Sequence, residues 1–210
     1  MKKRSRAFLA CAVVAFIILA GAVALGGDYP GGHLLYTYRM ETGVVGLAET
    51  TTTEITPAGD GRYDVVTTTR AEAERELIPM GLAGFSMRWL GGIDLSGLNA
   101  LSQQVLDPDR TYVTPDGGLL VTGDRVTVAG LSGVEGVYTQ ASAPNVRITV
   151  VLADDLVARH LLPLPLRVEI EYSQSSGPGL GEGASATDTY VSGKIELLEY
   201  VWSGVEGATE

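Results

Sequence analysis

The fold is decided by one stretch of sequence, VVGLAETTTTEI-TPAGDG-RYDVVTTTRAEAE, which runs from Val44 to Glu74. Apolar and threonine side chains alternate with period two in its first part, and threonine suits a half-buried strand better than a helix. Proline, glycine and aspartate between Pro57 and Gly61 form a turn sequence. The stretch therefore predicts two long antiparallel strands, Val44–Ile55 and Arg62–Glu74, joined as a hairpin.

The same alternation, interrupted by short turn sequences, recurs on both sides of this hairpin. It predicts a mostly β protein whose curved antiparallel sheet is a half-barrel or barrel, or else a sandwich, with one or two short helices. The further strands that we expect are His33–Met40, Phe85–Leu90, Arg110–Thr114, Leu119–Val121, Arg125–Leu131, Val134–Gln140, Val146–Leu152, Leu166–Ser173 and Thr187–Val201.

Two segments have helical periodicity. The first is Ser96–Leu106, in which Ser96 is a candidate N-cap and the leucines recur on one face. The second is Asp154–Leu162, which begins with two aspartates and is ended by Pro163. Both helices are predicted to be short.

The first 27 residues form a separate unit. Four basic residues precede an uncharged and mostly apolar run, Ala7–Leu25, whose length of about 28 Å as a helix just spans a bilayer core. We expect a hydrophobic helix that is either a retained membrane anchor or a signal peptide cleaved at small residues. Residues 28–202 are then a single exported β domain and residues 203–210 a flexible tail. The protein is expected in the cell membrane as a single-pass protein with its C-terminal domain outside the cytoplasm, or secreted after cleavage.

The charge of the exported part excludes one class of partner. Of 15 Lys and Arg, four lie before the apolar run, which leaves 11 against 25 Asp and Glu and gives a net charge of −14. Such an acidic surface repels phosphate backbones, so we expect no nucleic-acid partner. The only cysteine is Cys11, within the apolar run, so neither a disulfide nor a thiolate zinc site is expected in the exported part.

Catalytic chemistry has little support in the sequence. The two histidines, His33 and His160, stand far apart and without metal-binding spacing, and no nucleophile motif of a hydrolase occurs. We expect no catalytic residue, no metal site and no cofactor. The protein is thus predicted to bind rather than to catalyse.

The strongest candidate for a binding region is Leu77–Leu106, where large apolar residues alternate with glycines and few charges. One interpretation is the core face of a strand followed by leucines that close the end of the sheet. The other is an apolar cover over a ligand cavity. The candidate ligand-binding residues are Phe85, Met87, Trp89, Leu95, Leu98 and Leu101.

Two sets of residues resemble a known family. The opening His33-Leu-Leu-Tyr-Thr-Tyr-Arg-Met-Glu-Thr-Gly-Val-Val-Gly-Leu-Ala48 combines a strand, a break and a small-residue start to the next strand. Later, Leu162-Pro-Leu-Pro-Leu-Arg-Val-Glu169 is followed by Gly193-Lys-Ile-Glu-Leu-Leu-Glu-Tyr200. This order is similar to the exported prokaryotic family catalogued as domain of unknown function 3108. The resemblance implies a leader followed by a curved antiparallel sheet, and it implies no agreed activity.

Two hypotheses about function follow. In the first, a membrane-tethered or secreted, non-enzymatic β domain binds an apolar or lipid-like ligand. In the second, the domain is a structural or assembly module of the cell envelope that acts through protein–protein contacts. An apolar cavity of several hundred Å³ would favour the first hypothesis, and a filled core would favour the second.

Overall fold

The computed structural model describes residues 29–42, 47–74, 95–174 and 188–204. These residues form one antiparallel sheet of nine strands and two short helices, α4 (Ser96–Asn99) and α5 (Leu156–Leu161). The mostly β prediction is confirmed. The strands are β1 (His33–Thr42), β2 (Leu47–Gly59), β3 (Arg62–Ala73), β4 (Thr111–Val113), β5 (Leu119–Val128), β6 (Leu131–Thr139), β7 (Val146–Ala153), β8 (Arg167–Gln174) and β9 (Asp188–Ser203).

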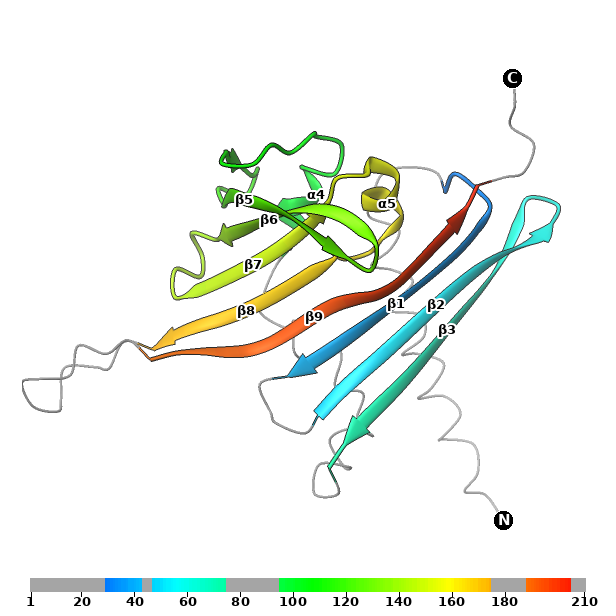
Figure 1. Ribbon diagram of the computed structural model, residues 1–210, viewed down its shortest axis with the longest axis horizontal. Helices are drawn as coiled ribbons and strands as arrows, with labels where there is room; N and C mark the ends of the chain where they lie inside the picture. Colours follow the sequence, from blue (N-terminus) through cyan, green and yellow to red (C-terminus); the bar gives the residue numbers. More distant parts are fainter. Residues whose placement is uncertain (1–28, 43–46, 75–94, 175–187, 205–210) are drawn as a thin grey trace, which may run out of the picture.

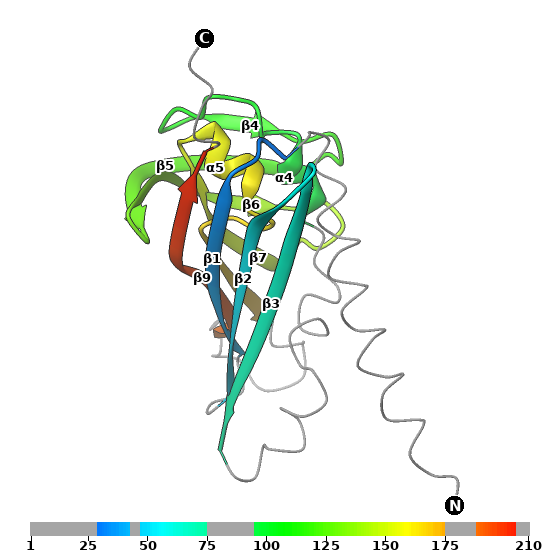
Figure 2. The same cartoon turned by 90° about the vertical axis from the view of Figure 1, so that its right-hand side faces the viewer.

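The strand order across the sheet is β3-β2-β1-β9-β8-β7-β6-β5-β4 (Figure 1). The last strand of the chain therefore lies between the first strand and β8. Two successive hairpins build the β3-β2-β1 end, and a meander from β4 to β8 builds the other end. Figure 2 shows the β5–β7 part of the sheet turned steeply across the direction of β1–β3.

The sheet is open within the described residues. Its order begins at β3 and ends at β4, and these two strands are not neighbours. The described strands therefore form neither a closed barrel nor a two-sheet sandwich, and these two alternatives of the sequence prediction are wrong for this part of the chain. Closure would require β3 and the three-residue β4 to pair, and β4 is too short to cover a strand of 12 residues.

The hairpin predicted from the sequence is present, with Ile55 opposite Val65 and Thr53 opposite Thr67. Its turn contains Asp60 at φ 54° and Gly61 at φ 71°, which is the left-handed region that these residue types favour. β2 continues to Gly59, further than expected. Pro57 is tolerated there because the pairing of β2 with β1 has already ended at Ile55, so no ladder bond to β1 requires its missing N–H.

Two expected strands are one. Leu119–Val121 and Arg125–Leu131 are joined in β5, whose register with β6 shifts between Thr122 and Arg125. The bulge lets one strand bend where the sequence suggests a break. The turn that follows lies at Ala129 and Gly130, both with positive φ, so Leu131 begins β6 instead of ending β5.

The first helix is much shorter than the predicted Ser96–Leu106. Its N-cap is Leu95, without a side-chain cap, so Ser96 does not have the expected role. After Asn99 the chain continues in turns, with hydrogen bonds from Leu101 N to Leu98 O and from Gln104 N to Leu101 O. The second helix is Leu156–Leu161, within the predicted Asp154–Leu162, and aspartates precede it as expected. Asp155 is its N-cap, because the Asp155 carboxylate accepts bonds from the amides of Val157 (2.7 Å) and Ala158 (3.2 Å).

The core lies on one face of the β5–β9 part of the sheet. The register places Leu120, Tyr138, Ile148 and Ile170 in one row across β5–β8, and each is at most 1% exposed. A second row joins Val150 to Val168 and Ile195, and all three are fully buried. α4 and α5 lie close to this core (Figure 2), and each contributes a buried residue to it, Leu98 and Ala158.

Candidate functional site: an apolar pocket beside α4

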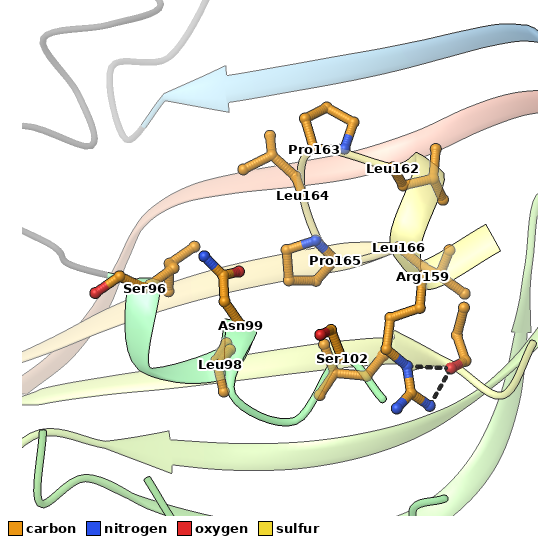
Figure 3. Close-up of a pocket in the computed structure, with 13 residues that line it drawn as sticks. Ser96, Leu98, Asn99, Ser102, Arg159, Leu162, Pro163, Leu164, Pro165 and Leu166 are labelled. Atoms are coloured by element: carbon orange, nitrogen blue, oxygen red, sulfur yellow. Dashed lines mark hydrogen bonds between the residues drawn. The ribbon is translucent and has the colours of Figure 1, made fainter. Parts of the chain in front are cut away.

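A cavity of about 280 Å³ lies between α4 and the segment Leu162–Leu166 (Figure 3). Its walls are mainly apolar, with polar side chains contributed by the helix side. The apolar wall includes Leu95, Leu98, Leu152, Leu162, Leu164 and Leu166, and the polar groups include Ser96, Asn99 and Ser102. Such a cavity accepts an apolar group and offers a few hydrogen-bonding partners at one side.

The segment Leu162–Leu166 is held in place at both ends. α5 stops at Leu161 because Leu162 takes the extended conformation that precedes a proline. At the other end the Leu166 amide donates to Val151 O (2.8 Å) and leads into β8. Between them, the hydroxyl of Tyr38 donates to Leu164 O (2.7 Å), and burial raises the pKa of Tyr38 well above its usual value. The wall of the pocket is therefore fixed to β1.

Arg159 of α5 joins the two sides of the pocket. Its Nε donates to Ala153 O (2.7 Å), and its Nη1 donates to Leu101 O (3.0 Å) and Gln104 O (2.6 Å). Two carbonyls in the turns after α4 thus accept hydrogen bonds from a side chain of α5, which holds these turns against that helix. Burial lowers the pKa of the guanidinium, and the charge of Asp154 opposes that shift.

A second polar group supports α4 from its N-terminal side. The carboxylate of Asp116, in the β4–β5 turn, accepts bonds from Tyr138 Oη (2.7 Å) and from Thr114 Oγ1. These bonds, the one from Thr114 first, lower the pKa of Asp116. Gly97 lies against them so closely that a Cβ there would be 2.5 Å from both Asp116 Oδ1 and Tyr138 Oη. The position of α4 depends on this contact.

The structure brings two of the six candidate residues to the pocket. Leu95 and Leu98 line it. Leu98 and Leu101 both belong to the core, and Leu101 is not part of the pocket lining. Phe85, Met87 and Trp89 lie outside the described residues. A binding role for any of the six stays a prediction.

Sequence reasoning did not select the opposite wall of the pocket. Its sequence signal is the alternation of Leu and Pro from Leu162 to Leu166, which is also part of the family resemblance. The role of Arg159 has no sequence signal, because the carbonyls that it binds belong to residues more than 50 positions earlier as well as to its own neighbourhood.

The histidines are separate from the pocket lining. His33 Nε2 lies 3.0 Å from Glu54 Oε1 on a partly exposed surface of β1 and β2, and His160 is on α5. Among the described residues, no group of three or more His, Cys, Asp or Glu is arranged to hold a metal ion. In the same residues no helix is long and apolar enough to cross a membrane, and the apolar run Ala7–Leu25 lies outside them.

Two solved structures are distantly similar to this chain. No family model matches the chain, and no curated protein matches its sequence. The chain is similar to the crystal structure of MucB, with 12% identity and a TM-score of 0.40 over 90% of this chain and 60% of that one. It is also similar to a chain in the complex of Pseudomonas aeruginosa MucA and MucB, with 12% identity and a TM-score of 0.36 over 90% and 57%. The chain thus spans about 60% of the length of these structures. At this distance the likeness says nothing of what this chain binds, and the resemblance to domain of unknown function 3108 stays a prediction.

Proposed function

We propose that this β domain is a non-enzymatic module of the cell envelope that acts through contacts with another protein. The observation that carries the proposal is the size and chemistry of the pocket beside α4. At about 280 Å³ it is at the lower end of the size of small-molecule sites, and its apolar wall, with three polar side chains at the helix side, suits one or two side chains of a partner. Anchor side chains seated in small apolar pockets contribute most of the energy of many protein interfaces.

A location outside the cytoplasm is part of the same proposal. The basic residues and apolar run of residues 1–27 support export with membrane attachment or cleavage, and the acidic exported part supports work outside the cytoplasm. A pocket that opens to solvent on such a domain would meet other envelope proteins. Arg159, which lines the pocket, and Tyr38, which holds its wall, are engaged with backbone carbonyls, and this supports a structural role for both instead of a catalytic one.

A second candidate function is binding of a small apolar or lipid-like ligand. The leucines on both walls of the pocket favour it, and two of them, Leu95 and Leu98, belong to the ligand-binding residues expected from the sequence. On this alternative the ligand itself, and not a protein side chain, would displace water from the cavity.

Site-specific photocrosslinking in the full chain, expressed in its own host, separates the two candidates. The photoreactive amino acid replaces Asn99, which is exposed at the pocket, and for comparison Ser142, which is exposed in the β6–β7 connection. We expect a protein adduct of defined mass at position 99 and none at position 142.

A variant that fills the pocket gives the matched control. Ser102→Trp should abolish the adduct because Ser102 lines the cavity, whereas Gln103→Trp, at the exposed neighbouring residue, should retain it. A lipid adduct with the same dependence on Ser102 would establish the second candidate function. Equal labelling at positions 99 and 142 would contradict both.

A further inference from the structure

Among the strands that the structure describes, β3 forms a long edge of the sheet without a partner on its outer side. It lies at one end of the strand order (Figures 1 and 2). It has 12 residues, and all of them except Ala73 are exposed. The opposite edge, β4, has three residues. A long edge rich in valine and threonine, with free backbone N–H and C=O groups, is a surface on which another strand can pair.

The two faces of β3 differ in chemistry. Thr67 and Thr69 point to one face, where their hydroxyls meet those of Thr53 (3.2 Å) and Thr51 (3.3 Å). Because side chains alternate along a strand, the even-numbered residues point to the other face. These include all four charged residues of the strand, in the order Arg62, Asp64, Arg70 and Glu72.

This order of charges is complementary to itself when the strand is reversed. In an antiparallel pair of β3 strands with Thr67 opposite Thr67, Arg62 lies opposite Glu72 and Asp64 lies opposite Arg70. Twofold symmetry makes each of these contacts occur twice. On the face that carries Thr67, Val65 of one copy lies opposite Thr69 of the other. Each face of one sheet therefore continues as the same face of the other.

The neighbouring registers that keep the same faces together are disfavoured. Centring the pair on Val66 places Arg62 opposite Arg70, and centring it on Thr68 places Asp64 opposite Glu72. Like charges directly opposite each other destabilise a strand pair, while opposite charges contribute about 0.2–1 kcal/mol. Charge therefore favours the register centred on Thr67 over both of these neighbours.

We propose that β3 is a self-association surface, on which a second copy of this chain pairs antiparallel through its own β3 with the twofold axis at Thr67. The pairing joins two nine-stranded sheets into one. The charged side chains are accessible to a second strand, because Arg70 is 80% exposed and Glu72 is 50% exposed. Within the chain, Glu72 lies 3.9 Å from Arg70 and 3.7 Å from Arg39, so pairing would exchange these long surface contacts for contacts across the interface. Charges on an edge strand ordinarily prevent pairing, but that protection fails when the charges of two copies match.

Disulfide trapping tests the register. In the full-length chain with Cys11→Ala, purified in detergent, Thr67→Cys places the two thiols directly opposite each other, within the Cα separation of 4.4–6.8 Å that a disulfide requires. Thr69→Cys is the matched control on the same face, because its partner is Val65 and the two thiols are about 13 Å apart along the strands. We expect rapid covalent dimer formation at position 67 and at least tenfold slower formation at position 69.

Charge reversal tests the contacts independently of cysteine chemistry. Asp64→Arg and Arg70→Asp each put like charges together at two symmetric positions, and each should raise the dimer Kd about tenfold or more. The two changes shift the net charge in opposite directions, so a shared effect cannot come from net charge. The double variant Asp64→Arg/Arg70→Asp should restore the wild-type Kd, and a mixture of the two single variants should form a heterodimer.

Sedimentation equilibrium of these proteins gives the deciding result, with far-UV circular dichroism to verify that each variant is folded. A wild-type protein that is monomeric up to about 100 µM would overturn the proposal. So would equal crosslinking at positions 67 and 69, or single variants that fail to associate when mixed although both are folded. The crosslinking experiment tests the pocket, and the association measurements test the β3 edge. Either proposal can therefore be contradicted without the other.

Discussion

The hydroxyl of Tyr138 donates a hydrogen bond of 2.7 Å to the carboxylate of Asp116, and Gly97 packs directly against this pair of side chains. Tyr138 is fully buried in β6, whereas Asp116 belongs to an exposed turn. The bond therefore attaches the β4–β5 turn to the core. Because α4 begins beside it, the bond also positions one side of the pocket.

We expect the stability of the protein to fall in acid partly through Asp116. Its pKa is lowered in the folded protein by the bonds from Thr114 and Tyr138, so its stabilising effect is complete above the ordinary carboxyl value and is lost as pH falls through the lowered pKa. Asp116→Asn should therefore flatten the acid limb of a plot of urea midpoint against pH. Asn at Asp109, an exposed turn residue, should leave that limb as in the wild type. Identical acid limbs for Asp116→Asn and wild type would contradict the prediction.

Gly97→Ala should destabilise the protein by about 1–3 kcal/mol, because its Cβ would overlap Asp116 Oδ1 and Tyr138 Oη. Gly123→Ala is the matched control, since the nearest atom to a Cβ there is Glu135 O at 3.9 Å. Urea unfolding followed by tryptophan fluorescence measures both. Equal midpoints for the two variants would show that α4 moves away from the contact without cost.

Arg159→Lys should lower the free energy of unfolding by about 2 kcal/mol, because an ammonium group cannot bind the carbonyls of Ala153, Leu101 and Gln104 at the same time. Amide hydrogen exchange should increase at Leu101 and Gln104 first, since their turns depend on the guanidinium. Arg125→Lys, at a side chain 49% exposed, should change stability by less than about 0.5 kcal/mol. Unchanged exchange in the 101–104 turns would mean that Arg159 does not hold them.

The N-terminal segment is expected to retain the protein in the membrane or to be removed on export. Fractionation followed by N-terminal sequencing distinguishes these outcomes. A retained anchor gives a membrane protein that resists high-salt washing and begins at Met1 or Lys2, and a cleaved leader gives a soluble exported protein that begins near Leu25. Full-length protein in the cytoplasmic fraction would contradict both.

Much of the local structure was predictable because it depends on neighbours in the chain. The alternation from Leu47 to Ala73 and the Asp60-Gly61 turn contain the whole β2–β3 hairpin. The cap of α5 by Asp155 is equally local, since a carboxylate and the amides two and three residues later are sufficient to form it. Sequence alone also determined the acidic charge of the exported part and the apolar run before it.

The tertiary structure decided what depends on partners that are distant in the sequence. The placement of β9 beside β1 follows from pairings across more than 150 residues that no local period encodes. The helix expected at Ser96–Leu106 ends at Asn99, and the turns that follow it are held by Arg159, far along the chain, through the carbonyls of Leu101 and Gln104. The pocket forms because long-range contacts bring α4 beside Leu162–Leu166.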